Sequence, residues 1–353
     1  MSLQFIPADQ VLAQLDAFSN VIDARSPGEY AEDHLPGALN WPTLDDEERR
    51  LVGTEYKQVS AFEAKKRGAA IAARNISAHI EREVMDKPKE WAPLLYCWRG
   101  GKRSGSLGLI LEQIGFRVSL VEGGYKAFRT ALVADIPQQV QRLRFQVVCG
   151  TTGSGKTRLL HALAREGAQV LDLEGLARHR SSVLGLLPGQ PQPTQKAFDT
   201  LVWNALRQLD PTRVVYIESE SKKVGNVVVP DSLILAMRAS ACLRLELPTE
   251  ERVKLLMQDY DFFVKDAAFF CERLETLTQV RGSEVVRHWQ DLARSGRMAE
   301  VVEDLLLRHY DPTYLQSMQR NFSQYPEAPT VTARDHSHEA MQALARTLLQ
   351  GEV

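Results

Sequence analysis

Cysteine is scarce in this sequence and its few residues are scattered. The four cysteines are Cys97, Cys149, Cys242 and Cys271, and no two of them form a Cys-x-x-Cys pair. This spacing excludes a zinc-finger framework and a disulfide scaffold, and it suits a reducing compartment. We therefore expect any functional cysteine to act alone.

Strong net charge and long apolar runs are also lacking. The formal net charge is −2, so binding to nucleic acid would need a local basic patch rather than a global field. No apolar run is long enough to cross a bilayer, and residues 1–7 lack the basic and apolar regions of a signal peptide. These absences predict a cytoplasmic protein with no membrane contact.

What is present is enough chain for two domains and an extension. The sequence has 353 residues, of which 44% are hydrophobic and 25% charged, the balance of a globular protein. Short apolar runs alternate with helical patterns through much of the chain, which favours α/β domains with parallel sheets.

One cysteine stands in a setting that favours chemistry. Cys97 follows an apolar run, residues 92–96, that predicts a buried strand. A helical pattern comes next and stops at Gly115, and Ser104 is placed to cap that helix. Between strand and helix, Gly100 and Gly101 permit a sharp turn whose amides would favour an anion. The loop comprises Cys97, Trp98, Arg99, Gly100, Gly101, Lys102, Arg103 and Ser104.

The cations of this loop support a catalytic interpretation. Arg99, Lys102 and Arg103 favour a thiolate at Cys97. A buried structural cysteine is the alternative, because free cysteine is often buried. Three cations and two glycines make a poor core, so we favour catalysis, with Cys97, Arg99 and Arg103 as the catalytic residues.

Two flanking segments resemble a rhodanese domain. Residues 23–30, Asp-Ala-Arg-Ser-Pro-Gly-Glu-Tyr, and 34–38, His-Leu-Pro-Gly-Ala, look like its first half. The cysteine loop with residues 121–128 looks like its second half. We expect Asp23 and Arg25 to be a buried pair that braces the loop, and His34 to be a packing residue. Ser26 to Glu29 matches a helix capping box.

The domain departs from the simple rhodanese pattern in two places. Residues 43–91 form a charged, helix-prone insertion, which we interpret as a solvated face without chemistry. Arg103 lies six positions after Cys97, whereas sulfur-transferring rhodaneses place arginine after five. This wider loop resembles that of rhodanese-like phosphatases and indicates a phosphorus oxyanion at Cys97.

A second motif follows in the next domain. An apolar run, residues 144–149, leads into Gly-Thr-Thr-Gly-Ser-Gly-Lys-Thr and then into a helical pattern ending at Gly167. Strand before and helix after are the context in which a Walker A motif binds phosphate. The predicted diphosphate-binding residues are Gly150, Gly153, Ser154, Gly155, Lys156 and Thr157.

The usual acidic partner of such a motif is altered. A conventional nucleotidase has aspartate after its second signature strand, but residues 214–221 offer Glu218 instead, a possible Mg²⁺ partner. No arginine finger or base-reading motif is evident. The P-loop therefore predicts a di- or triphosphate ligand without predicting its hydrolysis.

These patterns predict four regions. The rhodanese-like α/β domain covers 1–130, a linker 131–143, a P-loop NTPase-like parallel-sheet domain 144–248 and a helical C-terminal extension 249–353. In the last region, the aromatic pairs at 262–263 and 269–270 are expected in a core.

The two motifs together resemble the bacterial tRNA 2-selenouridine synthases, over nearly the whole chain. The resemblance implies that the sulfur of wobble 2-thiouridine in tRNA is first alkylated by geranyl diphosphate. The S-geranyl group is then replaced by selenium from selenophosphate. It also implies Mg²⁺ at the P-loop, no intrinsic metal and no bound organic cofactor. The expected partners are tRNA and the enzyme that makes selenophosphate, and no membrane.

Several alternatives stay open at this point. Cys97 could accept selenium covalently or hold the donor while it attacks the base. A rhodanese-like phosphatase and a P-loop ATPase or kinase with an inert rhodanese-like module are the rival functions. A weak set of candidate RNA contacts comprises Arg142, Arg144, Arg178, His179, Arg180, Lys222 and Lys223.

Overall fold

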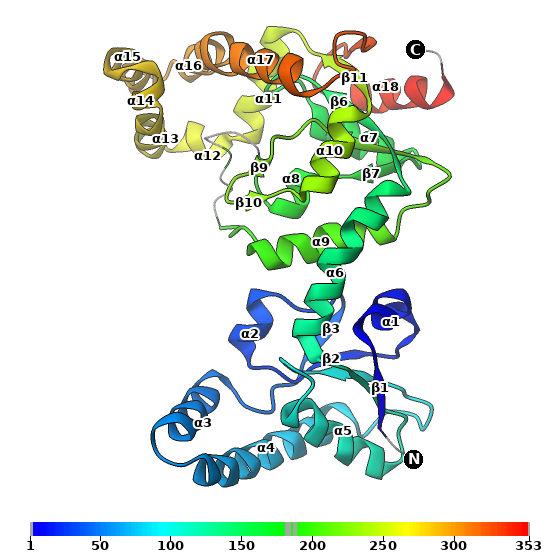
Figure 1. Ribbon diagram of the computed structural model, residues 1–353. Helices are drawn as coiled ribbons and strands as arrows, with labels where there is room; N and C mark the ends of the chain where they lie inside the picture. Colours follow the sequence, from blue (N-terminus) through cyan, green and yellow to red (C-terminus); the bar gives the residue numbers. More distant parts are fainter. Residues whose placement is uncertain (1–2, 181–184, 186–188, 352–353) are drawn as a thin grey trace. The chain divides into compact units, whose positions relative to one another are not determined.

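The computed structural model describes residues 3–180, 185 and 189–351. These residues form two compact units, each built on its own parallel sheet (Figure 1). Unit 1 takes the chain up to Gln138 together with Pro193–Asn204, and unit 2 takes Gln139–Gln192 and the chain from Ala205 onward. The predicted α/β class, with a parallel sheet in each half, is confirmed.

The sheet of unit 1 has five parallel strands in the order β1-β5-β4-β2-β3. Its central strands carry apolar residues on both faces, as expected where helices cover both sides. The strands are β1 (Gln4–Ile6), β2 (Val21–Asp23), β3 (Ala38–Asn40), β4 (Leu94–Tyr96) and β5 (Ser119–Val121). The helices are α1 (Ala8–Ala13), η1 (Leu15–Ala17), α2 (Pro27–Glu32), α3 (Asp46–Gln58), α4 (Ala61–Glu83), α5 (Lys102–Ile114) and α6 (Gly124–Gln141).

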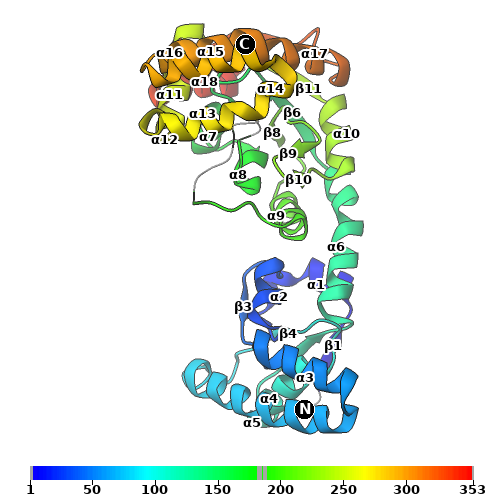
Figure 2. The ribbon, with the colours of Figure 1, turned by 90° about the vertical axis from the view of Figure 1, so that its left-hand side faces the viewer.

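The charged insertion of unit 1 is the helical pair α3 and α4, which pack on each other (Figure 2). Asp45 and Ser60 cap the two helices through their side chains. No residue of α3 is buried, in line with a solvated face. Helix α4 differs, because Ile76 and His79 are buried and Ile76 joins the core around Cys97.

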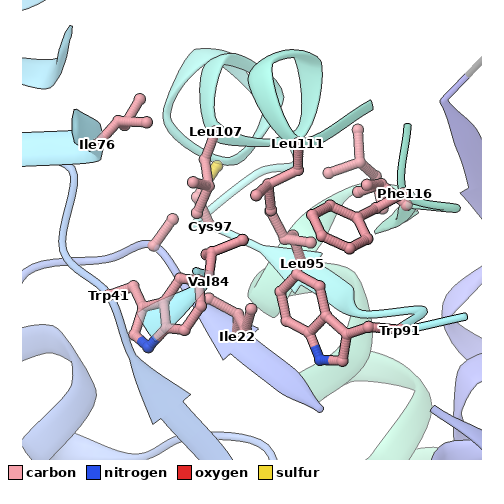
Figure 3. Packing of buried hydrophobic residues seen from close by; sticks show 13 residues of the cluster. Ile22, Trp41, Ile76, Val84, Trp91, Leu95, Cys97, Leu107, Leu111 and Phe116 are labelled. Atoms are coloured by element: carbon pink, nitrogen blue, oxygen red, sulfur yellow. The ribbon is translucent and has the colours of Figure 1, made fainter. Parts of the chain in front are cut away.

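The cysteine is itself a member of that apolar cluster. Figure 3 shows Cys97 with Leu107 and Leu111 of α5 on one side, and Trp41 and Trp91 among the residues across from them. The strand before Cys97 is fully buried, so the backbone that leads into the loop is held firmly.

Unit 2 has a second five-stranded parallel sheet in the order β12-β11-β6-β8-β7, and a small antiparallel pair, β9 with β10. Its strands are β6 (Arg144–Cys149), β7 (Gln169–Leu171), β8 (Val214–Glu218), β9 (Lys223–Val224), β10 (Val227–Val228), β11 (Ala241–Glu246) and β12 (Thr330–Thr332). Strand β6 is central, and the chain moves to one side of it for β7 and β8 and to the other for β11. The end of β6 is therefore the switch point at which α/β sheets bind ligands.

Helices cover this sheet and extend beyond it (Figure 1). They are α7 (Lys156–Arg165), α8 (Leu173–Ala177), α10 (Asp231–Ala239), α11 (Thr249–Asp259), α12 (Asp261–Lys265), α13 (Ala267–Leu274), η2 (Glu275–Leu277), α14 (Thr278–Arg281), α15 (Ser283–Arg294), α16 (Met298–Leu305), the π-helical η3 (Leu306–Tyr310), α17 (Asp311–Asn321) and α18 (His338–Gln350). Helix α9 (Gln195–Arg207) belongs to unit 1 through Asn204. Among the described residues, no helix is both long and apolar enough to cross a membrane.

The structure adds two details to the expected organisation of the chain. The segment 131–143, expected to be a linker, contains the boundary between the two units and is helical through Gln141 despite Pro137. Buried Leu132, Ile136 and Val140 recur every four residues, and packing of this stripe outweighs the hydrogen bond that proline removes. The C-terminal extension is not purely helical, because β12 pairs with β11 and completes the sheet.

Candidate functional site

The cysteine sulfur lies at the start of helix α5 and accepts two hydrogen bonds. The backbone N–H of Gly101 and the hydroxyl of Ser104 each donate to Cys97 Sγ at 3.2 Å. These two hydrogen bonds fix the position of the sulfur at the N-terminus of the helix. Ser104 was expected to cap the helix. Gly101 is the N-cap residue instead. Ser104 lies in the first turn of the helix, where its hydroxyl donates to the Cys97 sulfur.

The backbone of the Gly123–Gly124 turn packs closely against the backbone of the cysteine loop and supports it. The amides of Tyr125 and Lys126 donate to the carbonyl oxygens of Cys97 (2.8 Å) and Trp98 (3.0 Å). A Cβ at Gly124, whose φ is +62°, would overlap both the Cys97 carbonyl oxygen and the Gly100 nitrogen. Of the two glycines expected to make the loop's turn, Gly100 has φ +64°, whereas Gly101 has φ −98° and does not need to be glycine for that reason.

This close approach makes Gly124→Ala a sharp test of the loop. We expect it to cost about 3 kcal/mol of folding free energy, from positive-φ strain and steric overlap together, and to abolish chemistry at Cys97. The control is Gly37→Ala, because Gly37 has φ +71° but nothing within 4 Å of an added Cβ. It should cost only about 1 kcal/mol. Thermal unfolding measures both, and equal losses would show that loop contact is unimportant.

The cations of the loop have different environments. Arg103 donates to both carboxylate oxygens of Glu29, at 2.6 and 3.3 Å, and Arg49 lies 3.1 Å from the same carboxylate. Burial by itself raises the pKa of Glu29, but the hydrogen bonds and charge of Arg103, with Arg49, lower it below its usual value. Arg99 and Lys102 are exposed and have no ion pair within the described part of the chain.

Glu29 was predicted only as half of a capping box. That box is present, since the Ser26 N–H donates to the Glu29 carboxylate at 3.2 Å. Its second role, orienting Arg103, links residues 74 positions apart in sequence. The local capping pattern gave no signal for it.

A buried polar network stands behind the loop. Asp23 and Arg25 form the predicted buried pair, with a shortest contact of 2.7 Å. The Arg25 guanidinium lies 3.9 Å from the centre of the Tyr125 ring, and the Tyr125 hydroxyl donates to Asp33 at 2.6 Å. Burial raises the pKa of Asp33 despite this hydrogen bond. The predicted buried pair is confirmed, and its network includes Tyr125 and Asp33, which the sequence did not single out.

Two further predicted residues of this unit are accounted for. His34 stacks on Tyr30 with ring centres 3.9 Å apart, so it is a packing residue as expected. Trp98 stacks on Tyr125 at 5.4 Å, and the Lys196 ammonium lies 6.0 Å from the Trp98 ring centre. Lys196 comes from α9, whose first residues belong to unit 1.

In unit 2 the P-loop follows β6 and has tight packing at its glycines. Gly153 and Gly155 have φ of +75° and +87°, and a Cβ on Gly155 would come within 2.6 Å of Met341 Cε. A Cβ on Gly150 would come within 2.8 Å of the Leu245 carbonyl oxygen. These positions therefore require glycine, as the Walker A pattern predicts.

Lys156, the first residue of α7, points back to the loop. Its ammonium donates to the Gly150 carbonyl at 2.6 Å and lies 5.5 Å from the Tyr314 ring centre. The Gly150 N–H donates to the Tyr314 hydroxyl at 2.6 Å, and that hydroxyl also shares a hydrogen bond with Ser219 at 2.9 Å. Tyr314 of α17 is thus an unpredicted residue of the P-loop site.

Acidic residues gather beside the P-loop threonine. The Thr157 hydroxyl donates to Glu174 at 3.1 Å, and the Glu174 N–H donates to Glu218 Oε1 at 2.9 Å. Glu218 is buried, and its Oε2, like the Ser154 hydroxyl, has no hydrogen-bond partner among the described residues. Burial, followed by the charges of Asp172, Glu220 and Glu174, raises the pKa of Glu218 well above its usual range.

This arrangement fits a cation that is held jointly with phosphate. No group of three histidine, cysteine, aspartate or glutamate side chains capable of holding a metal occurs in the described ranges. Mg²⁺ at phosphate sites commonly takes only one or two protein carboxylates. The Glu218 carboxylate oxygen that lacks a hydrogen-bond partner and the Thr157 hydroxyl are suitable protein ligands for such an ion.

Helix α11 holds the outer part of the P-loop. Arg252 is buried and donates to the Thr152 carbonyl oxygen through Nε (3.0 Å) and Nη2 (2.8 Å). It also forms a two-point ion pair with Asp311, at 2.9 and 2.6 Å. With its donors engaged in this way, Arg252 fixes the loop and is not an arginine finger.

An apolar pocket opens beside Thr152. It encloses about 500 Å³ when the space open to solvent is included. All its other lining residues come from the region after Thr249, and Phe263 and Phe270 also belong to the predicted aromatic core. The lining residues are Thr152, Leu256, Met257, Tyr260, Phe263, Val264, Phe270, Met298, Val302, Leu305, Leu306 and Tyr310.

Most of the candidate RNA contacts make bonds within the protein. Arg142 donates to three carbonyl oxygens, the nearest that of Arg207 at 3.1 Å, and Arg144 donates to that of Thr212 at 2.9 Å. Arg180 donates to the Asp259 carbonyl at 2.5 Å, and Lys222 pairs with Asp231 at 2.8 Å. His179 is buried. Arg178 is the one described residue other than glycine whose φ angle is positive. These contacts give no support to the set as an RNA surface.

Family models match both halves of the chain. Residues 7–131 match the rhodanese-like domain, and residues 143–279 match the tRNA 2-selenouridine synthase AAA domain. A solved rhodanese-related protein from Thermoplasma volcanium is 17% identical over 35% of this chain and 89% of its own, with a TM-score of 0.24.

Curated relatives carry the comparison over most of the sequence. A tRNA 2-selenouridine synthase from Nitrosomonas europaea is 38% identical over 72% of this chain and 67% of its own. Those from a Sulfurovum species and Aeromonas salmonicida are each 31% identical. The matches cover 86% and 84% of this chain and 90% and 87% of the relatives. The protein therefore belongs to the tRNA 2-selenouridine synthase family, which is a family of enzymes.

Proposed function

We propose that this enzyme converts wobble 2-thiouridine in tRNA to 2-selenouridine through an S-geranyl intermediate. In the first step the thio sulfur attacks C1 of geranyl diphosphate, the carbon–oxygen bond breaks and diphosphate leaves. In the second, the selenium of selenophosphate attacks the carbon that bears the S-geranyl group, the carbon–sulfur bond breaks and geranyl thiol leaves; water then cleaves the selenium–phosphorus bond and phosphate is released. Geranylation makes the second step feasible because it turns a poor leaving group into a good one.

The apolar pocket beside Thr152 is the observation that carries this proposal. A P-loop alone selects phosphate oxygens, so the surroundings of the loop must select the rest of the ligand. Here the adjoining surface consists of aliphatic and aromatic side chains, a poor environment for a ribose or a base. A diphosphate with a hydrocarbon tail suits both parts of the site.

The residues of the P-loop would act on the departing diphosphate. Backbone amides and Lys156 would bind its oxygens, with Lys156 leaving the Gly150 carbonyl to do so. Glu218 and Thr157 would hold Mg²⁺, which supplies further positive charge to the leaving group. Tyr314 would position the first amide of the loop through its hydroxyl.

The cysteine loop would take selenophosphate. Its widened spacing suits a phosphate-sized anion, and Arg99 and Lys102 are exposed beside it. Cys97 would act as a thiolate, held by Gly101 and Ser104. The test of the whole proposal is mass spectrometry of nucleosides after purified protein acts on thiolated tRNA with both substrates. Absence of 2-selenouridine from a folded preparation would contradict it.

Ligand preference gives a direct prediction for the P-loop. Geranyl diphosphate should bind at least about tenfold more tightly than ATP, because burying most of its chain at about 25 cal/mol per Å² contributes several kcal/mol before ordering costs. Calorimetric titration with Mg²⁺ present measures both affinities. If ATP binds equally well, the P-loop ATPase interpretation gains.

A substitution in the pocket distinguishes binding of the geranyl tail from binding of the diphosphate group. Val302→Trp would fill part of the space that Val302 lines and should weaken geranyl diphosphate binding. Binding of inorganic diphosphate, which lacks the chain, should stay unchanged. An equal loss of affinity for both ligands would show that the geranyl tail does not bind in this pocket.

A further inference from the structure

A second hollow of unit 1 adjoins the cysteine loop. It lies between α1 and α6, is widely open, and encloses about 1220 Å³ when the solvent-open space is counted. Arg99 and Gly123 bring it to the edge of the loop. The lining residues, called the α1–α6 groove below, are Ala8, Asp9, Arg99, Gly123, Lys126, Ala127, Thr130, Ala131 and Ala134.

Two cations of the groove have no anionic partner. Arg99 and Lys126 are exposed, and neither forms an ion pair in the part of the chain that the structure describes. Asp9 is the one carboxylate in the lining. Other arginines of this unit differ, since Arg25 and Arg103 are paired with Asp23 and Glu29. The groove lining therefore holds two cations against one carboxylate, and neither cation is held in an ion pair within the described residues.

Its floor is suited to a polymer backbone rather than to a bulky apolar ligand. Ala127, Ala131 and Ala134 present only methyl groups along one side of α6, which leaves room for sugars and phosphates to approach. The groove is also fixed relative to the cysteine. The Lys126 amide donates to the Trp98 carbonyl, so Lys126 and the loop move together.

We propose that the α1–α6 groove binds phosphates of the RNA strand next to the modified uridine, with Arg99 and Lys126 as the contacts. This inference rests on the proposed function, in which tRNA is the substrate. An open groove with two exposed cations suits the phosphates of a nucleic-acid strand. The groove holds the strand while the base reaches the sulfur.

Removal of one contact should weaken tRNA binding in a salt-dependent way. We expect Lys126→Ala to lower affinity about fivefold at low salt, and to reduce the slope of log affinity against log salt by about one. Thr130→Glu, which puts a carboxylate into the groove, should weaken binding further. Both residues are exposed on α6, so folding should be preserved.

Matched controls use the same charge changes outside the groove. Arg117→Ala removes another exposed cation of unit 1, and Val133→Glu adds a carboxylate to an exposed position of the same helix that does not line the groove. Neither should change affinity by more than about twofold. If the controls weaken tRNA binding as much as the groove variants do, general charge explains the effect and the groove proposal is wrong.

Steady-state kinetics distinguish a failure of this inference from a failure of the proposed function on which it rests. With wild-type protein forming 2-selenouridine, Lys126→Ala should raise KM for tRNA about fivefold and leave kcat nearly unchanged. An unchanged KM and affinity would overturn the groove while the function stands. If the wild-type protein forms no product, the function fails, and the binding measurements still decide whether RNA occupies the groove.

Discussion

Cys97→Ala should abolish selenium incorporation and leave geranylation largely intact. The sulfur is the focus of two hydrogen bonds at the start of α5, and alanine offers no atom that can carry or hold selenium. The P-loop belongs to the other unit. Incubation of the variant with thiolated tRNA and geranyl diphosphate, followed by mass spectrometry, should therefore still show the S-geranyl nucleoside.

A graded variant strengthens this test. Ser104→Ala removes one of the two donors to the sulfur and should slow selenium transfer about tenfold rather than abolish it. If a folded Cys97→Ala protein also fails to geranylate, the assignment of one step to each unit is wrong.

The second large effect is expected at Lys156. Replacement by alanine removes the cation that, under the proposed function, stabilises the departing diphosphate, and loss of such a preorganised charge costs roughly a hundredfold or more in rate. Geranylation should collapse. Selenium transfer onto tRNA that has been geranylated beforehand should survive, because it needs the loop at Cys97.

The matched control is Arg165→Ala, which removes an exposed cation from the other end of the same helix. Its geranylation rate should stay within about twofold of wild type. Loss of both steps in a folded Lys156→Ala protein would count against the separation of sites.

Local patterns predicted most of the fold near the two motifs. Strand β6, the glycines at 150, 153 and 155, and the helix that begins at Lys156 follow from apolar runs and turn chemistry within about twenty residues. The strand before Cys97 and the helix ending at Gly115 are equally local. Such elements are set by short-range preferences, which one sequence displays directly.

Partners distant in the sequence could not be predicted in this way. Glu29 pairs with Arg103, Tyr314 reaches Gly150, and the pocket beside Thr152 is closed by helices more than a hundred residues later. Each contact depends on tertiary packing, which leaves no fixed spacing in the chain. Strand β12 was missed for a related reason, since three residues at a sheet edge carry almost no periodicity.

The docking of α9 on unit 1 has a consequence for synthesis of the protein on the ribosome. The Thr200 hydroxyl donates to buried Asp33 at 3.1 Å. The Trp203 indole N–H donates to Asp135 at 2.8 Å, and its ring packs edge-on against Phe128. These partners of the N-terminal unit are translated only after residues 139–192. Domains made early usually fold as they emerge, but here Asp33 lacks its contact with Thr200, and Phe128 its contact with Trp203, until the P-loop strand and its helix have been made. The nascent chain should therefore complete its N-terminal half late, and a fragment ending at residue 138 should be less stable than the same half within the full chain.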